Sequence, residues 1–498
     1  METVIISSMP INEIELKDMP LSTRLSVIDD GIRKKYLARL SEMQIAPIKN
    51  LQPLEDDLIS NIRLYHVKEM VYQKGESVTD KFTTVFNTLA TYNASVFILI
   101  DSDGKTANYY LGVRNNEPDE SAKKRSTVTL GDTLKQTLIG HFPGVKIENE
   151  DRKKIAELSK KISCAKNVAS VSVVGNIKSD KNMANEQFVQ GLEKLSLAMS
   201  GRAFTGLIIA DNQMPQNIQG LRAFYQDLYS KLSPYQKVQI SDNISTSTSR
   251  AKSLFEVDTK KKAAMGVSAA LSMAGVIGGS AVGGPVGGMI GGQIGGQFNG
   301  LINSLAPNEQ ITTGSSTTTS SSYENKAVTD MMALLDQLLK KTNEYDSYGM
   351  WNVAGYFVSD DMSTAEIAAS NYRSLMNGEN TGHEVSAVNS WRINNDVYLL
   401  EDFNTLTTYL SRYAHPQFVY YNDATVSAAT AVSGKELGLH LGLPRSSVPG
   451  LPVIEHAEFG KEVTTYQLFP QNVSLRPEDR MTLGKAVSYT HLTLPTRS

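Results

Sequence analysis

The chain has 498 residues, of which 41% are hydrophobic and 20% charged, and its formal net charge is -3 at pH 7. This length and composition exclude a wholly disordered chain and predict several domains with buried cores. The near-neutral charge provides no global attraction to nucleic acid. The single cysteine, Cys164, excludes an intrachain disulfide and a multi-cysteine zinc site. We expect it to be a buried, inert thiol.

The N-terminal residues contain acids and lack a basic stretch followed by an apolar core, so we expect no signal peptide and a cytoplasmic protein. Residues 1–60 alternate apolar clusters with charges and predict a helical N-terminal arm. The following unit, 61–150, is predicted to be an α/β unit with a β-hairpin. Strands at 95–100 and 107–113 flank Asp103-Gly104, a dipeptide that favours a tight hairpin turn. A helix before them is predicted by four apolar residues at helical spacing, Phe82, Val85, Phe86 and Leu89, with Ser77 and Asp80 suited to its start.

Two later segments repeat an order of strands and helices. Residues 151–240 predict strands at 168–177 and 204–211, each followed by an amphipathic helix. Residues 323–380 predict a helix, a strand at 351–361 and a helix whose Ser363 and Glu366 match a capping box. We expect these segments to be two halves of one domain with a layered sandwich, of α+β or α/β class. The region 381–485 is expected to be β-rich, with strands at 395–402 and 416–421 and a helix near 405–413.

Between the two halves lies an insertion, 241–322, with Ser/Thr-rich flanks. Its central part, 263–308, contains no Asp, Glu, Lys or Arg, and Pro285 divides it. Each glycine in a helix costs close to 1 kcal/mol relative to alanine, so a helix this rich in glycine requires close packing. The sequence therefore predicts a glycine zipper folded as a helical hairpin. Its stripe consists of Gly275, Gly279, Gly283, Gly287, Gly291 and Gly295.

Three interpretations of the hairpin remain open. It can pack on itself or on neighbouring subunits, which predicts a homo-oligomer. It can contact a membrane through 263–308, with Lys260–Lys262 as an anchor. The polar residues Gln293, Gln297 and Asn299 oppose insertion into a bilayer. A disordered loop is the third alternative.

No catalytic, cofactor-binding or metal-binding residue can be assigned from the sequence. Gly104-Lys105-Thr106 imitates part of a phosphate-binding loop, but the position that requires glycine five residues earlier is Leu99. We therefore interpret Gly104–Thr106 as a hairpin turn. The seven histidines show no short metal-ligand spacing.

Residues 434–460 resemble the segment that precedes the motor core in bacterial HerA/FtsK-type ATPases. In that segment a helix leads into a proline-marked element and a strand ending in Phe-Gly. Residues 61–82 and 96–113 also look like the N-terminal region of such proteins. The positions that match the pre-motor pattern are Leu443, Pro444, Ser447, Gly450, Phe459, Gly460, Leu483 and Gly484.

The resemblance implies a non-catalytic N-terminal assembly or regulatory region of a DNA-translocase-like ATPase. The family's Walker A loop, Walker B acid and arginine finger would lie after Lys485, so ATP, Mg and DNA are expected only for a motor domain missing from this chain. Residues 486–498 resemble a translated sequencing adaptor, and we expect them to be an artefactual tail. The main alternative is a membrane-associated scaffold that acts through the glycine hairpin. A stand-alone hydrolase or nucleotide-binding enzyme is a third.

Overall fold

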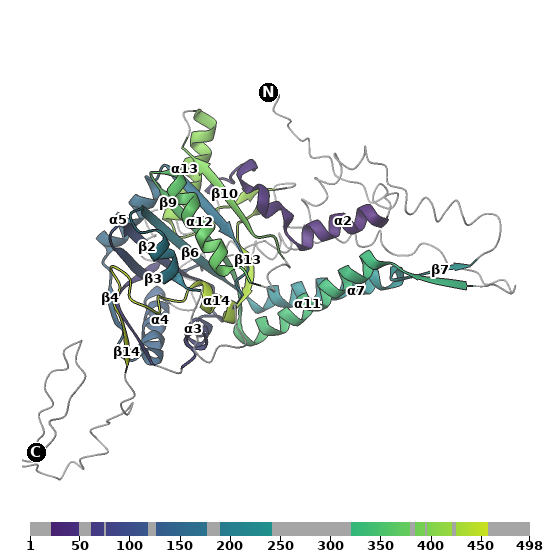
Figure 1. The fold of residues 1–498 in the computed structure, drawn as a ribbon, viewed down its shortest axis with the longest axis horizontal. Coiled ribbons are helices and arrows are strands. Elements are labelled where there is room, and N and C mark those ends of the chain that lie inside the picture. The colour runs from purple at the N-terminus through teal and green to yellow at the C-terminus, as the bar shows by residue number, and fades with distance from the viewer. Residues whose placement is uncertain are drawn as a thin grey trace, which may run out of the picture. The chain divides into compact units, whose positions relative to one another are not determined.

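The computed structural model describes residues 21–48, 61–73, 76–117, 126–176, 190–241, 320–378, 384–393, 396–420 and 425–456. They combine helices with a sheet of antiparallel strands, so the fold is of the α+β class, as predicted (Figure 1). The glycine stripe and Pro285 lie outside the described residues, as do Phe459, Gly460 and the C-terminal tail.

A ten-stranded sheet forms the centre of the described structure, with the strand order β10-β5-β9-β6-β2-β3-β1-β14. Two short strands, β4 (Lys146–Asn149) and β13 (Thr430–Ser433), pair with β1 and β9 outside this path. The strands of the main path are β1 (Ile62–Gln73), β2 (Ala94–Asp103), β3 (Ala107–Asn115), β5 (Asn167–Ser172), β6 (Ala203–Gln213), β9 (Met350–Ser359), β10 (Ala387–Arg392) and β14 (Val453–His456).

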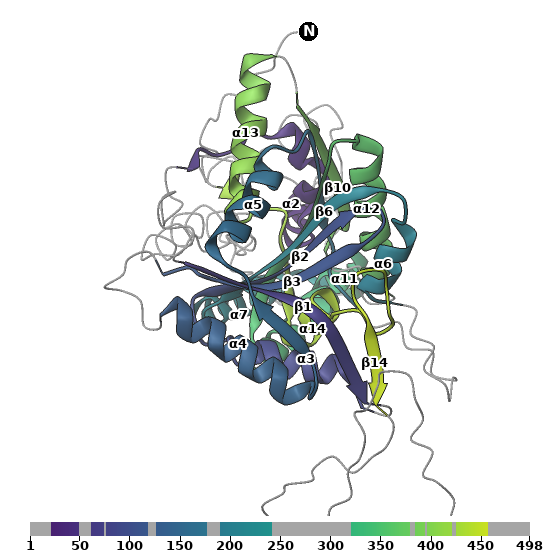
Figure 2. The same cartoon turned by 90° about the vertical axis from the view of Figure 1, so that its left-hand side faces the viewer.

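The central strands are apolar on both sides because both faces of the sheet are covered. Along β2, Val96 and Ile98 enter the core on one face, whereas Phe97 and Leu99 enter the core on the other. The first face packs against α3 (Val78–Asn87), α4 (Thr127–His141), α6 (Leu192–Ala198), α12 (Met362–Met376) and α14 (Gly434–His440). The second face packs against the 3-10 helix η1 (Lys35–Glu42), α5 (Arg152–Ser163) and α13 (Val397–Ser411) (Figure 2).

The segments before and after the insertion meet in this sheet. Strand β9 lies between β5 and β6, and Gln213 of β6 is the register partner of Met350 of β9. The other side of β9 is shared, because β5 pairs with its second half and β13 with its first half. Residues on either side of the insertion therefore build one continuous layer.

Local signals near the β2–β3 hairpin predicted the structure correctly. The Ser77 side chain accepts a hydrogen bond from the Asp80 amide at 3.3 Å and caps α3. Gly104 has a φ of 89°, a backbone conformation that glycine adopts without strain, and it lies in the turn between β2 and β3. The hairpin is thus formed by chemistry within its own few residues.

Three expectations were wrong. The cap of α12 is Asp361, whose carboxylate accepts from the Thr364 amide at 3.0 Å, so the helix begins before the predicted Ser363 capping box. The predicted strand 395–402 is the first part of α13, because Asp396 caps a helix whose Phe403 and Leu406 pack into the second-face core. Cys164 is exposed at the end of α5 rather than buried.

The segments that flank the insertion extend the β6–β9 hairpin into a structure that we call the stalk. It consists of α7 (Pro215–Leu232), α11 (Lys326–Tyr348) and a two-stranded ribbon of β7 (Lys237–Ser241) and β8 (Ser320–Glu324) (Figure 1). Helix α2 (Leu21–Ile32) shares an apolar core with α7 and α11. Arg222 of α7 donates to the Thr342 hydroxyl and carbonyl of α11, each at 3.1 Å, which fixes the pairing of the two helices.

Candidate functional site

The Gly104–Thr106 turn has its amide groups already occupied. The Asp103 carboxylate accepts from the Lys105 and Thr106 amides, each at 2.7 Å. These hydrogen bonds hold the pKa of Asp103 below its ordinary value. A phosphate-binding loop uses such amides to bind its ligand. Here a carboxylate of the same chain takes the place of the anion, and residues 104–106 form the predicted hairpin turn.

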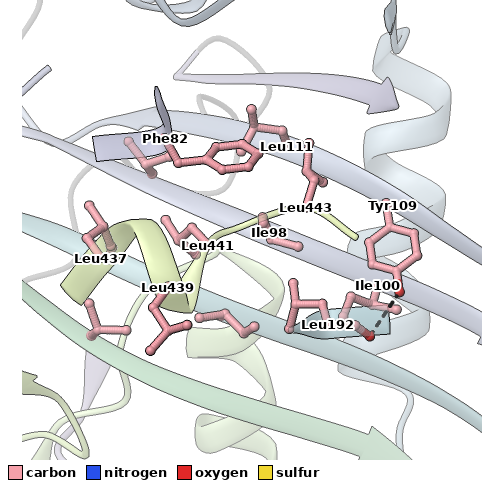
Figure 3. Packing of buried hydrophobic residues seen from close by; sticks show 14 of the residues in the cluster. Phe82, Ile98, Ile100, Tyr109, Leu111, Leu192, Leu437, Leu439, Leu441 and Leu443 are labelled. Atoms are coloured by element: carbon pink, nitrogen blue, oxygen red, sulfur yellow. Dashed lines mark hydrogen bonds between the residues drawn. The ribbon is translucent and has the colours of Figure 1, made fainter. Parts of the chain in front are cut away.

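The resemblance-derived residues Leu443 and Pro444 are both buried. Leu443 lies in the first-face core close to Phe82 and Leu111 (Figure 3). Its carbonyl accepts a hydrogen bond from the Tyr72 hydroxyl at 3.0 Å. These contacts anchor the chain directly after α14 to β1, β3 and α3.

Arg445 continues this attachment with polar contacts. Its guanidinium donates to the Thr79 hydroxyl at 2.7 Å, and its backbone amide donates to the Glu193 carboxylate at 3.3 Å. Burial raises the pKa of Glu193, and the contacts from Arg445 oppose that effect. The Leu443–Arg445 segment therefore joins α3, α6 and the edge of the sheet.

Gly450 is the second place where the resemblance-derived pattern meets a structural requirement. Its φ is 101°, and a Cβ atom at this position would lie 2.4 Å from the Ala107 carbonyl oxygen. The neighbouring Pro449 carbonyl accepts from the Ala107 amide at 2.9 Å. Only glycine allows the 448–451 turn to approach β3 this closely. We call residues 443–453, which include Leu443, Pro444 and Gly450, the joint.

Helix α14 connects the joint with the stalk. Ser433 and Glu436 form a capping box at its start. The Glu436 carboxylate also lies 3.2 Å from Lys341 Nζ of α11, and Lys341 donates to the Ala431 carbonyl at 3.3 Å. Burial raises the pKa of Glu436, whereas the Lys341 charge lowers it. The stalk is thus in contact, through a partly buried ion pair, with α14, the helix that precedes the joint.

The predicted glycine stripe, Gly275 to Gly295, lies outside the described residues, but the structure shows how its flanks are held. The β7–β8 register pairs Lys237 with Glu324 and ends with Ser241 opposite Ser320. The two ends of the intervening segment, 242–319, are therefore held side by side. Among the helices in the described ranges, none combines the length and apolarity that crossing a bilayer requires.

A row of polar residues that the sequence analysis missed crosses the second face of the sheet. Register places Arg114, Ser95, Asp211 and Asn352 next to one another on β3, β2, β6 and β9. The Ser95 hydroxyl donates to Asp211 Oδ1 at 2.5 Å. Burial lowers the pKa of Arg114, and the Asp211 charge opposes this effect. Asp211 is thus a counter-charge within a largely buried network.

His415 lies beside this row but does not complete a catalytic triad. Its Nε2 donates to the Asn352 carbonyl at 3.1 Å and lies 3.8 Å from Asp211 Oδ2. The Tyr356 hydroxyl lies 2.8 Å from its Nδ1 and donates to it. In a triad the histidine must reach the nucleophilic hydroxyl, whereas here Asp211 contacts Ser95. Ser95 and Asp211 are 116 residues apart in sequence, and His415 is 63 residues from Asn352, so no local spacing could have revealed the row.

Comparison with known proteins provides no family: no family model matches the chain, and no curated protein matches it. Within the described ranges, no group of three or more His, Cys, Asp or Glu side chains is placed to bind a metal ion. The candidate functional elements are the joint, whose residues the resemblance singled out and whose contacts the structure shows, and the stalk, which holds the two ends of 242–319.

Proposed function

We propose that the chain is a non-catalytic assembly or regulatory region of a HerA/FtsK-type, DNA-translocase-like ATPase. The observation that supports this proposal is the docked joint. Leu443 and Pro444 are buried, and Gly450 fits against Ala107 with no room for a side chain. In the resembled family this element precedes the motor. In this proposal α14, which the Lys341–Glu436 ion pair links to the stalk, transmits the position of the stalk to the joint that follows it.

In this function the chain forms oligomers and does not hydrolyse ATP. Sedimentation velocity of the purified chain is expected to show a species larger than the monomer, and a phosphate-release assay is expected to match a blank without protein. A monomer at every concentration contradicts the assembly role. Hydrolysis above the blank contradicts the non-catalytic assignment and supports the enzyme alternative. Genomic sequence following codon 485 tests the family: it should encode a GxxxxGK[ST] loop.

A second function, that of a membrane-associated scaffold, is supported by a different observation. The ribbon holds both ends of 242–319 together at Ser241 and Ser320, and the sequence between them includes the charge-free residues 263–308. This arrangement brings the two ends of the segment together at the end of the ribbon. It suits a segment that inserts its apolar residues into a lipid surface.

Vesicle flotation separates the two functions. The chain is mixed with phosphatidylglycerol-containing vesicles and compared with a variant in which Asn-Gly replaces residues 242–319. The scaffold function predicts that the chain floats with the vesicles and the variant does not. If neither protein floats, the scaffold function is wrong. If both float equally, the membrane contact lies elsewhere, and the role of the glycine segment is contradicted.

A further inference from the structure

Lys34 occupies an unusual position for a lysine. It separates α2 from η1 with φ 52° and ψ 47°, the left-handed conformation that glycine and asparagine adopt more readily. Its side chain is fully buried. A residue with a long charged side chain is therefore placed where both the backbone and the burial disfavour it.

The charge of Lys34 is balanced by one carboxylate. Lys34 Nζ lies 3.1 Å from Glu384 Oε2, and the Glu384 side chain is 8% exposed. Within the described part of the chain, neither atom makes an aligned hydrogen bond, so the contact is an ion pair without further support. Each of the two buried charges is therefore stabilised by the opposite charge of the other residue. The same two segments are joined by a backbone hydrogen bond from the Val385 amide to the Arg33 carbonyl at 2.8 Å.

The ion pair lies between the stalk and the sheet. On one side, Leu25, Ile28 and Ile32 of α2 pack into the apolar core shared by α7 and α11. On the other side, Asn389 of β10 donates from its side chain to the Leu37 carbonyl of η1 at 2.7 Å. Helix α2 on the stalk therefore continues into η1 on the second-face layer, and Lys34 is the residue at which the chain bends between them.

A buried ion pair contributes little net stability compared with an apolar pair, whereas loss of one partner is strongly destabilising. Such a pair therefore selects one arrangement over others. We propose that Lys34 and Glu384 form a latch that holds α2 as a brace on the stalk. When the latch is broken, α2 opens as a local unit and exposes the apolar faces of α7 and α11. This inference goes beyond the proposed function and does not depend on it.

Hydrogen exchange of the full chain, read by mass spectrometry, tests the latch with a double-mutant cycle. Lys34→Met and Glu384→Gln each leave one buried charge without its partner. Each is expected to accelerate exchange in α2 by roughly 100-fold or more, with β2 and β6 unchanged. The double variant removes both charges and is expected to recover most of the protection. Arg39→Met is the matched control, because Arg39 is 57% exposed and pairs with Glu42 within η1, and it should leave exchange in α2 unchanged.

Three results would overturn the latch. Unchanged exchange in both single variants shows that the pair does not hold α2. A double variant that exchanges as fast as the single variants shows that the two residues are not coupled. Equal acceleration in α2, β2 and β6 shows that the pair supports the whole fold rather than a local brace.

Discussion

Ser241 and Ser320 lie opposite each other at the end of the β7–β8 ribbon, although the segment 242–319 separates them in sequence. The chain runs out and back as one long hairpin of three successive pairs. These are the strands β6 and β9, then the helices α7 and α11, and last the β7–β8 ribbon. Folding of the described residues requires the two ends of the segment to meet. The β7–β8 pairing is made by residues 237–241 and 320–324 alone, without a hydrogen bond to the segment 242–319 within this register.

Replacing residues 242–319 by Asn-Gly is therefore expected to leave the stability of the sheet unchanged. Two residues are the length of a tight hairpin loop, and Asn-Gly adopts the positive φ angles that such a turn needs. Urea denaturation followed by tryptophan fluorescence measures this, because Trp351 is buried in β9. A loss of more than about 1 kcal/mol would show that the segment supports the folded core.

Gly450→Ala is expected to destabilise the protein by roughly 2 kcal/mol or more, because it combines a positive φ with a Cβ that would approach the Ala107 carbonyl. Gly220→Ala is the matched control. Gly220 lies within α7, and a Cβ there meets no atom within 4 Å. The control should stabilise the stalk by up to about 1 kcal/mol. Equal effects of the two substitutions in urea denaturation would contradict the structural role of the joint.

Asp211→Ala is expected to cost about 1–3 kcal/mol, because it leaves the Ser95 hydroxyl without its acceptor and removes the charge that opposes the effect of burial on Arg114. Asp330→Ala removes a carboxylate from an exposed pair with Lys326 and should change stability by no more than about 0.5 kcal/mol. The free energies of unfolding of both variants check this. Similar values for the two would mean that the polar row adds nothing to the core.

Acid is expected to destabilise the fold through two buried histidines. Burial lowers the pKa of His440 to about 3 and lowers that of His415. The Gly175 amide donates to His440 Nε2 at 3.0 Å, so the neutral ring carries its proton on Nδ1, beside the Tyr372 hydroxyl at 2.7 Å. Between pH 6.5 and 3 the unfolded chain binds a proton at this residue that the folded chain does not.

The free energy of unfolding therefore falls as the pH decreases below 6.5, by about 1.4 kcal/mol per pH unit for His440 alone. His440→Gln cannot titrate there, although its side-chain oxygen can accept from Gly175. Denaturation at a series of pH values should show a smaller slope for this variant than for the unchanged chain. An identical slope would mean that His440 does not titrate as its burial requires.

Short-range signals in the sequence predicted the local structure of several elements. Ser77 and Asp80 predicted the start of α3, and Asp103-Gly104 predicted the turn between β2 and β3. These features depend on hydrogen bonds and backbone angles within about four residues. Two other predictions of the same short-range kind were wrong: the strand at 395–402 and the capping box at Ser363. Aspartates just before the helices, Asp396 and Asp361, provide caps that the apolar patterns alone did not reveal.

In the candidate site, too, some features were predicted from the sequence and others were seen only in the structure. The family resemblance singled out Leu443, Pro444 and Gly450, but only the structure shows that Gly450 is required by its approach to Ala107. The glycine stripe stays a prediction, because Gly275 to Gly295 lie outside the described residues. The polar row and the Lys34–Glu384 pair had no signal in the sequence.

By itself, the sequence determined that helices and strands are mixed in an α+β or α/β fold, and that residues 104–106 form a hairpin turn; the antiparallel pairing of the strands then decided the α+β class. The tertiary structure alone decided that β9 lies between β5 and β6, that Asp211 accepts from Ser95, and that Lys34 meets Glu384. The physical reason is the separation in sequence of the residues that interact. Caps, turns and apolar periodicity depend on neighbours in the chain, whereas strand order and buried charge pairs are selected only when distant segments desolvate each other in one core.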